Sequence, residues 1–205
     1  MAPFIRKGSS CMEFVPHGQQ SFHVRSFIDM IEKLNFEIDE YDKTRLTDGT
    51  NEARAYRGLN CAWTAWHVHD WFWQWIVDDR SELVSRINAA LTSNLPEPPS
   101  KYPTKFGEAI AQKYRPLAVC RTVATAAKHS RADRYPDLLV TRGVYVTRGE
   151  SFSTSEQWFD LRVFDNSENR VKYFDQLIKE AAGSWTTFFR DIGIWTIKNG
   201  WVLDR

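Results

Sequence analysis

The stretch that most constrains the fold runs from residue 59 to residue 75, LNCAWTAWHVHDWFWQW, and contains five tryptophans. A helix of this sequence is apolar around most of its circumference, so it has to be buried on most sides. We therefore predict a helix over about 51–78 at the centre of a bundle. At least three of the rings of Trp63, Trp66, Trp71 and Trp73 are expected to be largely buried. The two histidines and the aspartate within this apolar surface need polar partners.

Apolar residues recur at three- and four-residue steps in several other parts of the chain, which is the pattern of amphipathic helices. The helices predicted from this pattern span about 21–42, 80–93, 104–113 and 116–129, with a last long helix starting near Asn169. We expect the last helix to pack against the first. Residues 1–19 carry Gly, Pro and Ser without a clear period and are expected to form an irregular arm.

At residues 138–164 the helical spacing of apolar residues gives way to an alternating pattern. The segments VTRGVYVTRGES and QWFDLRVF alternate β-branched and aromatic residues with others, which is typical of an antiparallel hairpin. Asn199-Gly200 between two short apolar runs predicts a small terminal hairpin. A chain of 205 residues is too short for two ordinary domains. The sequence thus predicts a single, mainly α domain, a helical bundle of four to six helices with an inserted β-hairpin near 138–164.

The charge balance and the cysteines bear on partners and location. Lys and Arg number 27 against 26 Asp and Glu, so no overall field draws the protein to nucleic acid or to an anionic membrane. Cys11, Cys61 and Cys120 are odd in number and widely spaced, which favours a reduced, cytoplasmic protein. No apolar run of signal-peptide or membrane-spanning length is present, so we expect neither secretion nor membrane insertion.

His67 and Asp70 are three residues apart, so they would lie on one face of the central helix, with Gln74 one turn further on. A carboxylate beside an imidazole fixes its tautomer and orientation, as a catalytic or ligand-binding histidine requires. The alternative is a core histidine whose ring nitrogens are satisfied by neighbouring groups. His69 is two residues beyond His67 and is expected to point away from it, so that the two do not serve one site.

Metal and nucleotide chemistry find no support in the sequence. Cys61, His67, Cys120 and His129 do not follow the spacing of a metal-binding motif, and no paired Glu-x-x-His motif of di-iron bundles is present. The chain also has no GxxxxGK or GxGxxG phosphate loop and no GxSxG nucleophile turn. We expect no metal and no cofactor.

Arg121 and His129 are eight residues apart on one predicted helix, about 80° apart around its axis. Both side chains could therefore reach one phosphate near the helix end. Lys128 would add charge, and His67 and Asp70 of the central helix are expected to be supporting groups. A guanidinium holds a phosphate through paired hydrogen bonds, and an imidazole moves a proton at a ribose hydroxyl. The alternative is a basic last turn that complements the helix dipole.

The helical core, together with Arg121 and His129 in the segment RTVATAAKH, resembles the HEPN superfamily of small helical domains from prokaryotic toxins and antiviral systems. The resemblance extends over the helical parts from about 21 to 130. Thr122 takes the polar position after the arginine, and the spacer to His129 is longer than in the usual family motif. The resemblance implies metal-independent RNA cleavage, with Arg121 and His129 brought together across a homodimer, in a defence or toxin-antitoxin system.

Two other hypotheses about the function remain. In one, the protein is a non-catalytic helical module for binding a protein partner, and the His/Trp cluster is purely structural. In the other, His67 and Asp70 serve a small-molecule or metal enzyme. The readings differ in whether His67, Arg121 and His129 share one solvent-accessible site, because catalysis requires access and core packing does not.

Overall fold

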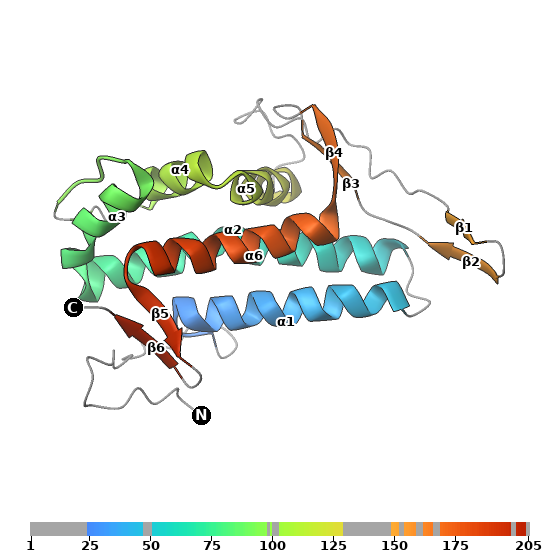
Figure 1. The fold of residues 1–205 in the computed structure, drawn as a ribbon, viewed down its shortest axis with the longest axis horizontal. Helices are drawn as coiled ribbons and strands as arrows, with labels where there is room; N and C mark the ends of the chain where they lie inside the picture. Colours follow the sequence, from blue (N-terminus) through green and yellow to red (C-terminus); the bar gives the residue numbers. More distant parts are fainter. Residues whose placement is uncertain are drawn as a thin grey trace.

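A computed structural model describes residues 24–46, 51–97, 99, 103–128, 149–151, 154–158, 162–165, 169–197 and 200–203. Within them the chain forms six α-helices, a short 3₁₀ helix and three antiparallel pairs of strands (Figure 1). The helices are α1 (Phe27–Leu46), α2 (Asn51–Asp79), η1 (Ser81–Leu83), α3 (Val84–Leu91), α4 (Thr104–Lys113), α5 (Arg115–Lys128) and α6 (Phe174–Asp191). The predicted mainly α bundle with inserted strands is confirmed.

The long helix α2 is the centre of the bundle, as its apolar sequence predicts. It packs against α1, α4, α5 and α6, and Figure 1 shows α6 lying in front of it with α1 alongside. The indole Nε1 of Trp185 on α6 donates a hydrogen bond of 2.8 Å to the buried carbonyl of Ala65 on α2. This bond fixes the two helices against each other at a point where both surfaces are apolar.

The helices share one hydrophobic core that is rich in aromatic rings. The ring of Phe72 on α2 lies 5.2–5.6 Å from rings of α1, α4 and α6, measured between centroids. The apolar stripe of α6 is buried along its whole length, at Phe174, Leu177, Ile178, Ala181, Trp185, Phe188 and Phe189. The predicted packing of this last helix against the first is confirmed.

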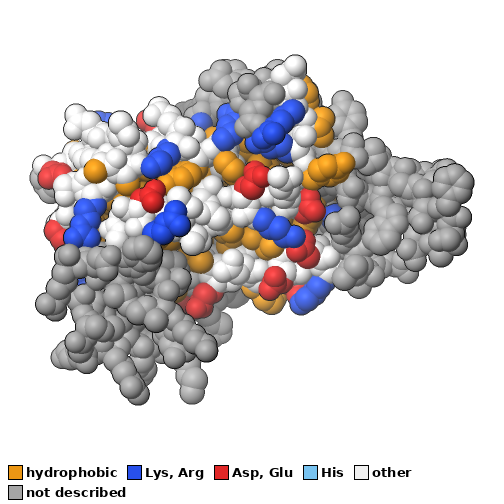
Figure 2. Space-filling model, viewed as in Figure 1, with side chains coloured by type: hydrophobic (Ala, Val, Ile, Leu, Met, Phe, Trp, Pro, Cys, Tyr) orange, Lys and Arg blue, Asp and Glu red, His pale blue; other side chains and the backbone are white. Residues whose placement is uncertain are grey.

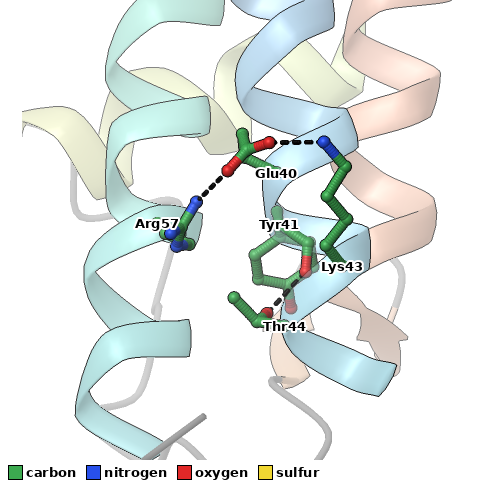
Figure 3. Close-up of polar contacts among 5 residues, drawn as sticks. All are labelled: Glu40, Tyr41, Lys43, Thr44 and Arg57. Atoms are coloured by element: carbon green, nitrogen blue, oxygen red, sulfur yellow. Dashed lines mark hydrogen bonds and ion pairs between the residues drawn. The ribbon is translucent and has the colours of Figure 1, made fainter. Parts of the chain in front are cut away.

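Polar contacts at one end of the bundle fix the register between α1 and α2. Glu40 on α1 accepts hydrogen bonds from Lys43 at 2.6 Å and from Arg57 of α2 at 2.9 Å (Figure 3). These contacts, first that of Lys43 and then that of Arg57, hold the pKa of Glu40 below its ordinary value. Further along the same pair of helices, Lys33 donates to the hydroxyl of Thr64. The two helices therefore run antiparallel with Lys33 opposite Thr64 and Glu40 opposite Arg57.

The strands correct the predicted end of the insertion. Between α5 and α6 the chain forms β1 (Gly149–Ser151) paired with β2 (Thr154–Trp158), and β3 (Arg162–Asp165) paired with β4 (Arg170–Tyr173). The last helix begins at Phe174 and not near Asn169, because the alternating residues of β4 pair with β3 before the helical period takes over. Residues 138–148 lie outside the described part of the chain. The predicted terminal hairpin is confirmed as β5 (Ile194–Ile197) and β6 (Gly200–Leu203).

The four tryptophans expected in the core differ in their burial. Trp73 is fully buried, Trp66 and Trp71 are partly buried against the core, and Trp63 is exposed over 51% of its surface. Trp63 is exposed because the helices that pack against α2, which are α1, α4, α5 and α6, leave part of its circumference uncovered. The assumption that an apolar helix is covered all round is therefore wrong on this arc.

The hydropathy of the described helices and the charges on one face of the molecule bear on the expected partners. None of the described helices combines the length and the apolar character that a membrane span requires. Figure 2 shows Lys, Arg, Asp and Glu side chains interspersed over the face formed by α6 and α1. If that face binds a charged partner strongly, it must do so through a small group of neighbouring side chains.

Candidate active site

His67 and Asp70 form a hydrogen-bonded pair on a partly exposed arc of α2. The Nδ1–H of His67 donates to Oδ2 of Asp70 at 2.6 Å, and the two side chains are 35% and 40% exposed. The i,i+3 spacing on a helix brings them together, as the sequence predicts. Burial acts to raise the pKa of Asp70, but the hydrogen bond from His67 and the charges of both histidines together hold it below its ordinary value.

This contact decides the chemistry that His67 can perform. A carboxylate accepts hydrogen bonds, so the proton of a neutral His67 lies on Nδ1 and the lone pair lies on Nε2. A ring in this tautomer can take a proton from a substrate hydroxyl through Nε2, while Asp70 stabilises the imidazolium that results. The ring of Trp63 lies edge-on to His67, with centroids 5.0 Å apart, and limits how far the imidazole can swing.

His69 belongs to the same cluster, which corrects the expectation that it points elsewhere. Its Nε2 lies 3.2 Å from Oδ1 of Asp70, and its ring lies 6.3 Å from that of His67, centroid to centroid. Asp70 stands on the arc between the two histidines, about 60° from His67 and about 100° from His69 on an ideal helix. One carboxylate can therefore contact both rings, although they are on different sides of α2.

His69 is held more tightly than His67. It is only 6% exposed, its Nδ1–H donates to the carbonyl of Trp66 at 2.7 Å, and its ring lies 4.1 Å from the Trp66 indole, centroid to centroid. Gly107 of α4 closes over the ring, where an added Cβ would approach Cδ2 and Nε2 of His69 to 2.9 and 3.0 Å. Burial lowers the pKa of His69. A side chain larger than that of glycine on α4 would displace the ring.

Arg121 enters the cluster from α5. Its guanidinium carbon lies 5.7 Å above the centroid of the Trp66 ring, a cation–π arrangement. Its charge reaches His69 and acts to lower the pKa of that imidazole. Small buried residues on α5, Ala118, Cys120, Thr122 and Ala124, allow this close approach to α2. The structure thus brings one predicted cation, Arg121, to the indole that also supports His69.

Other candidates from the sequence do not join the cluster among the described residues. His129 and the side chain of Lys128 lie outside them. Gln74 donates to Asp78 at 2.8 Å instead of to Asp70. Cys61 and Cys120 are free and buried, and burial raises the pKa of each thiol to about 12. Within the described part of the chain no group of three or more His, Cys, Asp or Glu could hold a metal ion.

Sequence reasoning missed three residues of this cluster, His69, Trp66 and Gly107. The angular position of Asp70 between the two histidines was the one signal in the sequence that pointed to His69. Gly107 and Trp66 carried no signal, because their role depends on where α4 and α5 cross α2.

Comparison with known proteins gives no relative from which to transfer a function. The chain matches no protein family, no curated protein and no solved structure.

Proposed function

We propose that this protein binds RNA at the cluster of His67, Asp70 and Arg121 and cleaves the RNA backbone without a metal ion. The observation that carries the proposal is the 2.6 Å contact between Nδ1 of His67 and Asp70 on an accessible arc of α2. This contact places the lone pair of a neutral His67 on Nε2, the atom through which a general base would act. Arg121 of the neighbouring helix supplies a cation above the ring of Trp66, one residue before His67 on α2.

The proposed reaction is an internal transfer at phosphorus. Nε2 of His67 takes the proton of a ribose 2′-hydroxyl, whose oxygen forms a bond to phosphorus while the bond from phosphorus to the 5′-oxygen breaks. Arg121 balances the charge on the non-bridging oxygens through paired hydrogen bonds. We assign the acid that protonates the leaving 5′-oxygen to His129, which directly follows the last residue of α5. The products are a 2′,3′-cyclic phosphate end and a 5′-hydroxyl end.

The test is cleavage of a mixed RNA pool in the presence of EDTA. His67→Gln removes the base, and Arg121→Gln removes the cation. Arg115→Gln, on the same helix but at its first residue, is the matched control for the loss of one positive charge. We expect cyclic phosphate ends from the unmodified protein and the control, and loss of cleavage in the other two. A folded, unmodified protein that neither cleaves nor binds RNA rules out the proposal.

A second function is favoured by a separate observation, three exposed aromatic side chains on the outer side of α1 and α2. Phe36, Tyr56 and Trp63 are 64%, 66% and 51% exposed. The contacts of Lys33 with Thr64 and of Glu40 with Arg57 place Phe36 opposite the α2 segment between Tyr56 and Trp63. Exposed aromatic residues gathered in this way are typical of protein interfaces.

On this alternative, the surface of Phe36, Tyr56 and Trp63 binds a second copy of the chain and the histidines are structural. Sedimentation of the unmodified protein and of the double variant Phe36→Ser/Trp63→Ser tests it. A dimer that the double variant abolishes, without loss of helical circular dichroism, supports the interface. An unmodified protein that stays monomeric at high concentration excludes this interface.

A further inference from the structure

His67 lies in a stripe of α2 that the helices around it leave open to solvent. The side chains of this stripe recur at three- and four-residue steps and are exposed or partly exposed: Tyr56, Asn60, Trp63, His67, Asp70, Gln74 and Asp78. The side chain of His67 is 35% exposed, and that of Trp63, one turn before it, is 51% exposed. A small molecule or a second protein can therefore reach the imidazole from solvent.

The contact with Asp70 makes Nε2 the reactive nitrogen of this imidazole. Asp70 accepts the Nδ1–H of a neutral His67 at 2.6 Å, so the lone pair lies on Nε2. When this lone pair forms a bond, positive charge develops on the ring, and the carboxylate beside Nδ1–H stabilises that charge. The edge of Trp63, 5.0 Å away between centroids, limits the rotation of the ring. His67 thus has the features of a nucleophile as well as those of a base.

The surroundings of His67 favour an electrophile with a good leaving group. Among the residues that the structure describes, the groups around its ring are the Asp70 carboxylate and the rings of Trp63 and His69. The carboxylate is an acceptor, the indole is not an acid, and the Nδ1–H of His69 is held by the carbonyl of Trp66. None of these groups is placed to protonate a poor leaving group. Acyl phosphates and phosphoramidates need no such acid, because they release a carboxylate or an amine that is already protonated.

We propose that Nε2 of His67 is a nucleophile that accepts a phosphoryl group from an acyl phosphate or a phosphoramidate. Its lone pair forms a bond to phosphorus while the bond from phosphorus to the carboxylate oxygen or to the ammonium nitrogen breaks. The leaving group departs with the electron pair of the broken bond, and the Nδ1–H stays bound to Asp70. The resulting phosphohistidine lies on the open stripe of α2, where a second protein can receive the group. This modification does not depend on the RNA reaction, in which the same lone pair removes a proton and forms no bond to phosphorus.

The test is phosphorylation of the full chain by phosphoramidate and, separately, by acetyl phosphate, with N-acetylhistidine in the same solution as a reference. Correlated ¹H–³¹P magnetic resonance identifies the modified nitrogen. We expect one or both donors to modify His67 at Nε2 alone and faster than the reference, whose two ring nitrogens both react. His69 should stay unmodified, because it is buried. An adduct on Nδ1 of His67, or a rate no higher than that of the reference with both donors, would overturn the proposal.

Variants separate the effect of Asp70 from access alone. His67→Gln should remove the label. Asp70→Asn keeps the shape of the side chain without its charge and should slow labelling roughly tenfold, the order of effect of one hydrogen bond to a charged group. Asp78→Asn, on the same stripe, is the matched control for the loss of one negative charge and should label at the unmodified rate. A folded Asp70→Asn that labels as fast as this control refutes the role of the pair.

The rate and the nitrogen selectivity of the unmodified protein decide the matter even if Asp70→Asn fails to fold. The RNA assay distinguishes the two proposals. Labelling of His67 without cleavage refutes the RNA function and leaves the phosphoryl acceptor intact. Cleavage by a protein whose His67 resists both donors refutes the phosphoryl acceptor alone.

Discussion

Gly107→Ala tests whether α4 and the His69 ring are packed as closely as the structure requires. The new Cβ would lie 2.9 Å from Cδ2 and 3.0 Å from Nε2 of His69, and 3.3 Å from Cη2 of Trp66. Carbon atoms in contact prefer about 3.5–4.0 Å, so the ring or the helix must move by roughly half an ångström or more. The ring cannot give way easily, because its Nδ1 is hydrogen-bonded to the Trp66 carbonyl and its face lies 4.1 Å from the Trp66 indole, centroid to centroid.

Two opposing contributions set the magnitude of this change. Replacing a helical glycine by alanine stabilises a helix by about 1 kcal/mol, while overpacking a tight site costs about 1–3 kcal/mol. We therefore expect Gly107→Ala to lower the free energy of unfolding by about 1 kcal/mol. Gly183→Ala on α6 is the matched control, because a Cβ there meets nothing within 4 Å and gives only the gain in helix propensity.

Urea denaturation measures the free energy of unfolding of both variants, and Gly183→Ala should be the more stable by about 2 kcal/mol. For a chain of this size it corresponds to about 4–8 °C in Tm. If Gly107→Ala is as stabilising as Gly183→Ala, the ring of His69 does not lie against α4, and the cluster described above is not formed.

Three further predictions concern stability. Trp73→Ala should lower the free energy of unfolding by about 3–5 kcal/mol, because this ring is buried, and Trp63→Ala should lower it by less than about 1 kcal/mol, because this ring is exposed. Equal losses of stability in urea titrations would contradict the exposure of Trp63. Trp185→Phe should cost about 2 kcal/mol, because it removes the buried hydrogen bond to α2; no change in Tm would show that this bond is not formed. In a Cys11→Ser variant, Cys61 and Cys120 should react with a thiol reagent at pH 8 only when the protein unfolds. The pKa of each thiol is about 12 in the folded protein and about 8.5 in an unfolded chain. The contribution of the two thiols to stability is therefore complete below about pH 8.5 and falls as the pH rises toward 12. Rapid labelling of the folded protein would refute their burial.

The positions of several helices were determined by the sequence alone, because periodicity is a local property. The first helix, predicted over about 21–42, begins later, at Phe27, and ends at Leu46. The predicted helix at 104–113 has the bounds of α4, and the predicted helix at 51–78 differs from α2 by one residue. The stripe of α6 from Phe174 to Phe189 was likewise evident from three- and four-residue steps. The last helix was predicted to start near Asn169, yet Val171 is an exposed residue of β4, since strand pairing with β3 is a contact that no local period reveals.

The pairing of His67 with Asp70 also followed from the sequence, because one turn of helix fixes it. The place of His69 did not, since its ring is positioned by Gly107 of α4 and by the indole beneath Arg121 of α5. A helix that is apolar on nearly every side does not specify which of its arcs its neighbours will cover. Only the packing of α1, α4, α5 and α6 around α2 decided that Trp73 is buried, that Trp63 is exposed, and that His67 and Asp70 are partly exposed while His69 is buried.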